Sequence, residues 1–300
     1  MINGIMNIYK EAGYTSHDVV AKLRGIVKQK KIGHTGTLDP DAVGVLPVCF
    51  GNATKLCDLM TDKSKEYEAV MRLGVTTDTQ DLSGRILRES VVASTASEIE
   101  NVIMSFVGGY EQIPPMYSAL KINGKKLYEL AREGKEVERQ PRHVEISYIR
   151  ILDMNIPDVR FVVGCSKGTY IRSLCADIGE QLGCGAAMAQ LKRTRVGNFR
   201  VEDAVTLSQV EELMRQGTYE KYVIAPDSVF MEYAGAVVKR ASEDALSNGN
   251  KLYPRQLDFD SAVLLKDGDM LRVYNGSREF KAVYVFVKNE GVLKPFKMFL

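Results

Sequence analysis

Apolar side chains recur at two different periods along the chain, which indicates that it contains both helices and strands. Residues 19–27 carry apolar side chains at helical spacing, and Thr15 or Ser16 stands where a helix cap is expected. Residues 67–74 alternate instead, so that Tyr67 and every second residue after it share one face of a strand. The same reasoning predicts further strands at residues 5–9, 144–152 and 159–165, and helices that begin near Ser97, Leu127, Ile171 and Thr206.

Polar and turn-forming segments separate these elements. Residues 76–84 are rich in hydroxyls and carboxylates and are expected to form a loop. Pro114 and Pro115 stop any helix and favour an extended segment. Residues 191–200 alternate apolar and basic side chains, which predicts a strand with one charged face.

The pattern changes after about residue 232, where short strand candidates are separated by Gly, Asn and Asp turns. A chain of 300 residues is long enough for one large domain and one small one. We therefore expect an α+β protein whose C-terminal part, from about residue 233, is a small all-β unit. Its strand candidates are residues 237–240, 262–265, 270–274 and 280–287.

The composition is that of an ordinary folded protein, with 45% hydrophobic and 26% charged residues and a net charge of +2. This charge balance does not by itself indicate nucleic acid, so a basic surface would have to come from clustered charges. The five cysteines are odd in number and lack C-x-x-C spacing, which argues against a disulfide framework or a zinc site. Because no stretch approaches about 18 continuous apolar residues and residues 1–10 lack a signal-peptide pattern, we expect a cytoplasmic protein without a membrane partner.

Basic residues gather in two places. The polar face of the first helix is expected to carry Lys22, Arg24, Lys28, Lys30 and Lys31, and from this run alone a solvated surface is favoured over a phosphate-binding one. Residues 121–143 have many charges and little apolar content, so the segment is expected to project from the core. A solvated excursion and an RNA-gripping element are equally compatible with it.

Residues 33–47 form the segment best suited to chemistry, because Gly33, Gly36, Gly44 and Pro40 constrain its backbone. The chain has no P-loop, no G-x-G-x-x-G after a strand, no G-x-S-x-G and no H-E-x-x-H. Taken singly, Asp39 before a proline is more often a turn former than a nucleophile.

An arginine beside Asp39 would keep the carboxylate ionised, and Arg172 is a natural candidate. The sequence alone does not place the two residues together. From the residues alone, the chain is either a metal-independent enzyme or an RNA-binding protein.

Four motifs in order resemble those of the TruB family, the pseudouridine synthases that modify uridine 55 in the T-loop of tRNA. Residues 33–40 (GHTGTLDP) resemble the family's signature loop. Residues 10–16, 67–81 and 166–172 resemble its K-P-x-G-x-T-S, Y-x-x-x-x-x-L-G-x-x-T-D-T-x-D and K-G-T-Y-I-R motifs, and residues 114–126 fit as well. The match spans residues 4 to about 200 with compatible spacing.

The resemblance implies a pseudouridine synthase fold: a central mixed, largely antiparallel sheet flanked by helices, with a small all-β PUA-like C-terminal domain. The expected boundaries are 1–232 for the catalytic domain and 233–300 for the PUA-like RNA-binding domain. No metal and no cofactor are implied. The residues carried over are Asp39, Tyr67 and Arg172 for catalysis and His34, Tyr67, Tyr170 and Leu191 for substrate binding.

In the family, the aspartate is the nucleophile, the arginine pairs with it, and the tyrosine stacks on the target base and is a candidate for proton transfer at C5. The histidine enters the T-loop in place of flipped bases, and the positions matched by Tyr170 and Leu191 line the uracil pocket. The insertion at about 121–143 is expected to grip the T-arm, and the C-terminal unit to contact the acceptor stem. The lysines expected to contact RNA are Lys22, Lys30, Lys31, Lys121, Lys125 and Lys126.

A standalone, monomeric enzyme acting on tRNA without a protein partner is the expectation from this resemblance. Two alternatives stay open: a guide-RNA-dependent subunit of a ribonucleoprotein, and a tRNA-binding folding chaperone in which catalysis is secondary. The chain departs from the family loop at Thr37, Asp41 and Val43, and Glu11 replaces a proline. Asp41 adds a second carboxylate near Asp39, and we expect it to face away, because a like charge would raise the pKa of the nucleophile.

Overall fold

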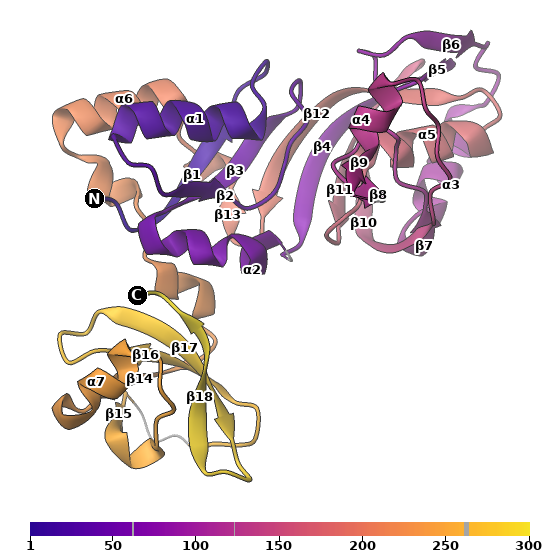
Figure 1. Ribbon diagram of the computed structural model, residues 1–300. Coiled ribbons are helices and arrows are strands. Elements are labelled where there is room, and N and C mark those ends of the chain that lie inside the picture. Colours follow the sequence, from indigo (N-terminus) through magenta and orange to yellow (C-terminus); the bar gives the residue numbers. More distant parts are fainter. Residues whose placement is uncertain (62, 123, 261–263) are drawn as a thin grey trace.

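The structure is a computed structural model that describes residues 1–61, 63–122, 124–260 and 264–300. It is an α+β protein with a large sheet and a separate C-terminal sheet below it (Figure 1). In the described part of the chain, no helix is both long and apolar enough to cross a membrane.

The main sheet has nine strands, and its central path runs β1-β3-β12-β4-β11-β10-β7. All neighbours on this path are antiparallel except β12 and β3, which pair in parallel. The prediction of a mixed, largely antiparallel sheet is therefore confirmed. The bounds are β1 Gly4–Lys10, β3 Val43–Phe50, β12 Ala186–Val196, β4 Lys65–Leu73, β11 Asp158–Cys165, β10 Arg142–Asn155 and β7 Gly108–Gln112, with β2 Ile32–His34 beside β3 and β13 Phe199–Arg200 beside β12.

Helices cover the two halves of this sheet and bury two separate cores (Figure 1). Helices α1 (Ser16–Val27) and α6 (Leu207–Gln216) pack on the half that contains β1 and β3. Helices α3 (Ala96–Ser105) and α5 (Ile171–Gln181) pack on the half that contains β4, β10 and β11. The short helices α2 (Cys57–Thr61) and α4 (Leu127–Arg132) connect other elements.

Two helix ends differ from the prediction. Helix α3 is capped by Thr95 rather than Ser97, because Thr95 and Glu98 form a reciprocal capping box. Helix α1 ends at Val27, where Lys28 turns into the left-handed region with φ 52°. The placement of Lys30 and Lys31 on the face of this helix was therefore wrong, because both follow it.

Two strand predictions also need correction. The loop expected at residues 76–84 overlaps a hairpin of β5 (Val75–Thr77) and β6 (Ile86–Glu89). The strand predicted at 191–200 is the end of β12 plus β13, with a turn between them, and it has no exposed charged face at Arg193, which is buried. Strand β12 lies inside the sheet, with its two edges paired to β3 and β4.

The C-terminal sheet has the order β15-β14-β16-β17-β18 and its own apolar core. One short helix that was not predicted, α7 (Glu243–Ser247), precedes β15 in this β domain. Of the strand predicted at 262–265, residues 262 and 263 lie outside the described residues, and 264 and 265 are not in a strand. The bounds are β14 Ala234–Val238, β15 Leu257–Phe259, β16 Met270–Tyr274, β17 Phe280–Val287 and β18 Val292–Met298.

A fourth apolar cluster joins the C-terminal sheet to the rest of the protein. Val283 and Phe299 pack there with Phe230 of the connecting segment and with Ile5 and Met60 of the larger part. The Asn52 side chain also donates a hydrogen bond to the Phe299 carbonyl at 3.2 Å. The two sheets are therefore in direct contact.

Two helical glycines give opposite predictions for the same substitution. A Cβ on Gly179 in α5 would lie 2.0 Å from the Ala186 nitrogen, whereas one on Gly25 in α1 would meet nothing within 4 Å. We expect Gly179→Ala to lower the free energy of unfolding by about 1–3 kcal/mol through overpacking. Gly25→Ala, the matched control, should raise it by about 0.5–1 kcal/mol. Urea denaturation measures both, and a stabilised Gly179→Ala would contradict the close contact between α5 and β12.

Candidate active site

The loop between β2 and β3 is held from below by the buried ammonium group of Lys10. Its Nζ donates to the carbonyls of Pro40 at 2.8 Å, Ala42 at 2.6 Å and Glu11 at 3.1 Å. The Leu38 amide donates to the Ser16 hydroxyl at 2.9 Å. Burial lowers the pKa of Lys10 to about 8. These contacts fix the backbone on both sides of Asp39.

Arg172, in the first turn of α5, meets Asp39 at the centre of the site. Its Nε lies 3.0 Å from Asp39 Oδ2 and its Nη2 donates to Asp39 Oδ1 at 3.3 Å, so the pair is bidentate. The guanidinium also donates to the carbonyls of Tyr117 at 2.8 Å and Thr79 at 3.0 Å. The structure thus brings together the aspartate and arginine that the sequence could only propose as partners.

A second carboxylate, Asp81, lies on the other side of Arg172, with its Oδ2 3.7 Å from Nη1. Asp81 is itself fixed by the hydroxyl of Thr79, which donates to its Oδ1 at 2.7 Å. Arg172 is only 5% exposed, so its charge has little contact with water. Two carboxylates and two carbonyls therefore satisfy one buried guanidinium.

The Asp39 carboxylate is the accessible member of this network, with 40% of its side chain exposed. Burial of its surroundings raises the pKa of Asp39, and the negative charge of Asp81 adds to this effect. The positive charges of Arg172 and Lys10 act in the opposite direction. They favour the ionised carboxylate that a nucleophile requires.

Tyr67 and Leu191 lie on the neighbouring strands β4 and β12 and belong to the apolar cluster next to the Asp39 loop. Tyr67 on β4 is 8% exposed, and burial raises its pKa. Leu191 on β12 packs against the cluster that contains Tyr67 and Leu38. Asp39 contributes to the pKa shifts of both Tyr67 and Tyr170, as expected for groups close to that carboxylate.

Tyr170 caps the start of α5 through its backbone, which exchanges two hydrogen bonds with the Gln112 side chain at 2.8 and 3.0 Å. Arg172 follows Tyr170 by two residues. The hydrogen bonds to Gln112 on β7 therefore fix the backbone from which the Tyr170 and Arg172 side chains project.

His34 lies at the end of β2, at the start of the same loop. Its Nδ1 accepts a hydrogen bond from the Gly36 amide at 3.3 Å, and its ring meets His17 edge-on with centroids 5.2 Å apart. Burial lowers the pKa of His34 to about 4. The imidazole is therefore neutral at neutral pH, which suits contact with a stacked base.

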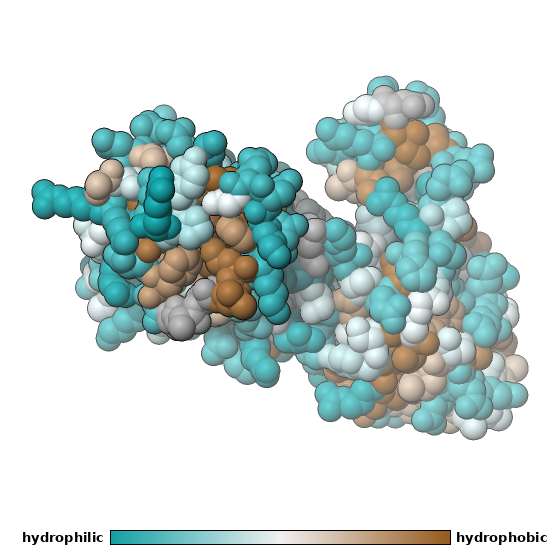
Figure 2. Space-filling view, turned by 90° about the horizontal axis from the view of Figure 1, so that it is seen from below, coloured by the Kyte–Doolittle hydropathy of each residue, from teal (hydrophilic) through white to brown (hydrophobic). Residues whose placement is uncertain are grey.

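The six lysines expected to contact RNA fall into two groups on different halves of the main sheet. Lys22 is on α1, and Lys30 and Lys31 follow that helix. The others are on the short strands β8 (Lys121–Ile122) and β9 (Lys125–Lys126) beside α4 (Figure 1). Seen from below, Figure 2 shows the C-terminal sheet in front and the half of the main sheet that carries α3 and α5 further back, with a gap between them.

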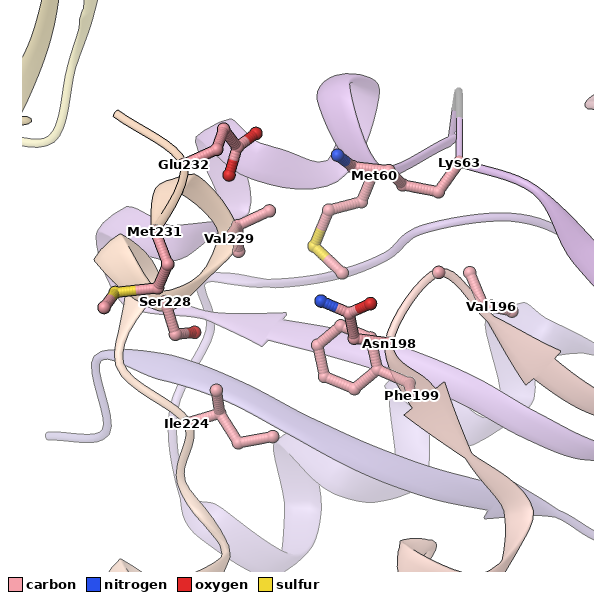
Figure 3. Close-up of a pocket in the computed structure, with 11 residues that line it drawn as sticks. Met60, Lys63, Val196, Asn198, Phe199, Ile224, Ser228, Val229, Met231 and Glu232 are labelled. Carbon is pink, nitrogen blue, oxygen red and sulfur yellow. The ribbon is translucent and has the colours of Figure 1, made fainter. Parts of the chain in front are cut away.

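The apolar cavity drawn in Figure 3 lies elsewhere and contains none of these site residues. It measures about 320 Å³ and is bounded by α2, the turn between β12 and β13, and the segment that leads to the C-terminal sheet. Met60, Asn198 and Phe199 point into it (Figure 3). The chemistry suggested by Asp39 therefore belongs to the open site and not to this cavity.

Two residues of the site were missed as functional candidates. Lys10 and Asp81 both lie within quoted motifs, at the first position of residues 10–16 and the last position of residues 67–81. The motifs could have pointed to them, but their contacts with the loop and with Arg172 depend on the fold. Asp41 is exposed, as expected for a carboxylate that faces away from Asp39.

Comparison with known proteins identifies the family. The model for the N-terminal domain of TruB family pseudouridylate synthases matches residues 24–171, and the model for the tRNA pseudouridylate synthase B C-terminal domain matches residues 172–230. The tRNA pseudouridine synthase B of Lachnoclostridium phytofermentans is 50% identical over the full length of both chains. That of Clostridium acetobutylicum is 48% identical over 93% of this chain and 94% of its own.

Solved structures agree with this relationship. A chain from a Cbf5-Nop10-Gar1 complex superposes with a TM-score of 0.73 at 28% identity, over 99% of this chain and 85% of that one. A chain from an H/ACA RNP bound to a substrate RNA containing 2′-deoxyuridine gives 0.72 at 27% identity, with the same coverage. The predicted pseudouridine synthase fold is therefore confirmed, and the chain belongs to the TruB family of tRNA pseudouridine synthases.

Proposed function

We propose that this enzyme converts uridine 55 in the T-loop of tRNA into pseudouridine, with Asp39 as the nucleophile. The observation that carries the proposal is the bidentate pair of Asp39 with the buried Arg172, close to Tyr67. The reaction breaks the N1–C1′ bond, turns the base and forms a C5–C1′ bond. The proton on C5 is lost and N1 gains one, so the product is an isomer of the substrate.

Each site residue has a role that suits this reaction. Asp39 attacks either C1′ of the ribose or C6 of the uracil, and Arg172 keeps its carboxylate ionised and aimed. Tyr67 stacks on the uracil and is placed for proton transfer at C5. The substrate base has to leave a folded loop at a cost of a few kcal/mol, which the neutral ring of His34 offsets by stacking in the space it vacates.

The two lysine groups lie on the two halves of the main sheet, which suits a tRNA held across both halves. Lys22, Lys30 and Lys31 would meet phosphates on one side, and the insertion at 121–143 would grip the T-arm from the other. In this proposal residues 1–232 form the catalytic domain, and the PUA-like domain at 233–300 contacts the acceptor stem. The enzyme acts as a cytoplasmic monomer.

A standalone enzyme is favoured over a guide-RNA-dependent subunit by the sequence identities of the two groups of relatives. The relatives named tRNA pseudouridine synthase B reach 48–50% identity over nearly the whole chain, whereas the ribonucleoprotein chains reach 27–28%. The open, ion-paired Asp39 also supports a catalytic role over a purely chaperoning one.

Tritium release from tRNA transcripts that contain 5-³H-uridine tests the proposed activity without a guide RNA. We expect release by the wild-type enzyme and a loss of about 10⁴-fold or more in Asp39→Asn, because the amide cannot act as the nucleophile. Asp41→Asn is the matched control, since it makes the same change at an exposed position on the same loop. No release by the wild type would contradict the standalone activity, and release by Asp39→Asn would contradict the assignment of the nucleophile.

The acid limb of the kcat/KM profile tests the electrostatics of the site. Asp39 has to be ionised, and its raised pKa means that activity falls as the pH drops through that pKa. Because the charge of Asp81 raises the pKa of Asp39, Asp81→Asn should move the acid limb to lower pH. It should also lower the plateau, since Arg172 loses one of its carboxylate partners.

Asp41→Asn is again the control and should leave the acid limb in place, because Asp41 is exposed and the charges acting on Asp39 are those of Arg172, Asp81 and Lys10. A shift of the limb in Asp41→Asn, or an upward shift in Asp81→Asn, would contradict this description of the site.

A further inference from the structure

We propose that Arg193 is a positioning residue for the reaction, which aligns the loop that carries Asp39 with the strand that carries Tyr67. The inference rests on the proposed function, since that function gives Asp39 and Tyr67 their roles. Arg193 lies on β12, the strand that separates β3 from β4 in the main sheet. It touches neither carboxylate of the network around Arg172 in the described structure.

The burial of Arg193 needs an explanation. Its side chain is among the largest that are fully buried, and the residue is only 2% exposed. Within the described residues, no carboxylate lies close enough to form an ion pair with it. An uncompensated buried charge is costly, so a guanidinium in such a place has to be held by other polar groups.

Backbone carbonyls of the catalytic loop supply those groups. The Nη2 of Arg193 donates to the Gly36 carbonyl at 3.2 Å, and Nη1 donates to the Thr37 carbonyl at 3.3 Å. Its Nε donates to the Val45 carbonyl at 2.7 Å. These acceptors lie before and after Asp39 in the sequence, so one planar guanidinium holds both segments of the loop.

The same guanidinium faces the catalytic tyrosine. Arg193 and Tyr67 are direct partners across β12 and β4. The positive charge of Arg193 works against the burial that raises the pKa of Tyr67. Arg193 therefore lies beside the phenol and makes its ionisation easier, which suits proton transfer at C5.

Close packing prevents the loop from moving independently of Arg193. Gly44 has a φ of +106°, and a Cβ there would lie 2.2 Å from the Arg193 carbonyl oxygen. The two residues pair across the parallel contact of β3 and β12. The end of the loop is thus seated on the backbone of Arg193 while its start is bound by the side chain.

Single-turnover rates at saturating enzyme, measured by tritium release, separate this role from RNA binding. We expect Arg193→Met to lower the rate by about 10²-fold or more, the size of effect found when a fixed hydrogen-bond donor is removed from an active site. The Kd for tRNA should stay within about threefold of the wild-type value, because Arg193 is buried and cannot reach the RNA surface. Lys22→Met is the reference for a lysine expected to contact RNA, and it should raise the Kd for tRNA while leaving the single-turnover rate at saturation unchanged.

Arg193→Lys keeps the test decisive if the methionine variant does not fold. An ammonium retains the charge but cannot bond the Gly36, Thr37 and Val45 carbonyls together, so we expect a rate about tenfold below the wild type and above that of Arg193→Met. Arg195→Met, two residues along β12, is the matched control, because the Arg195 side chain bonds to Gly197 and not to the loop. It should keep the wild-type single-turnover rate.

Wild-type rates in folded Arg193→Met or Arg193→Lys would overturn the inference. So would a loss that is explained entirely by weaker tRNA binding or by a smaller folded fraction in circular dichroism. These outcomes differ from failure of the proposed function, in which the wild-type enzyme itself would release no tritium from tRNA.

Discussion

The ion pair between Asp39 and the buried Arg172 is the interaction on which the site depends. A guanidinium that is 5% exposed requires acceptors around it, and here they come from segments far apart in the sequence. Asp39 lies on the loop before β3, and Asp81 lies in the hairpin after β4. The Tyr117 carbonyl comes from the segment between β7 and β8. Packing α5 against the sheet therefore brings the proposed catalytic groups together and buries the arginine at the same place.

Two further buried cations, Lys10 and Arg193, hold the backbone of the same loop. Lys10 binds carbonyls on one side of Asp39, and Arg193 binds carbonyls on both sides. Both use backbone acceptors, so they restrain the loop without neutralising the Asp39 carboxylate directly. The surrounding positive charge favours the ionised form of Asp39, as its proposed role requires, and also suits a polyanionic substrate. Rigidity and electrostatics thus arise from the same side chains.

Local patterns were sufficient for most elements of the fold. The alternation at Tyr67 predicted β4, and the apolar stripe after Thr15 predicted α1, because each side-chain period reports the face that is buried. The pairing of Asp39 with Arg172, 133 residues apart, could not be derived from spacing and needed the motif resemblance or the fold. Arg193 was predicted only as part of the charged face of a strand, and its burial could not be predicted because its carbonyl acceptors lie on a loop far away in the sequence. Helix α7 lies where the sequence offered only turns and short strands.

The most direct test of the central ion pair is the single-turnover rate of Arg172→Lys on unguided tRNA. A lysine keeps the positive charge but has one nitrogen, so it cannot hold both oxygens of Asp39 and also reach the Thr79 and Tyr117 carbonyls. We expect the rate to fall about 10²–10³-fold, with a Kd for tRNA within about threefold of the wild type. A rate equal to that of the wild type would contradict the dependence of the site on the buried guanidinium.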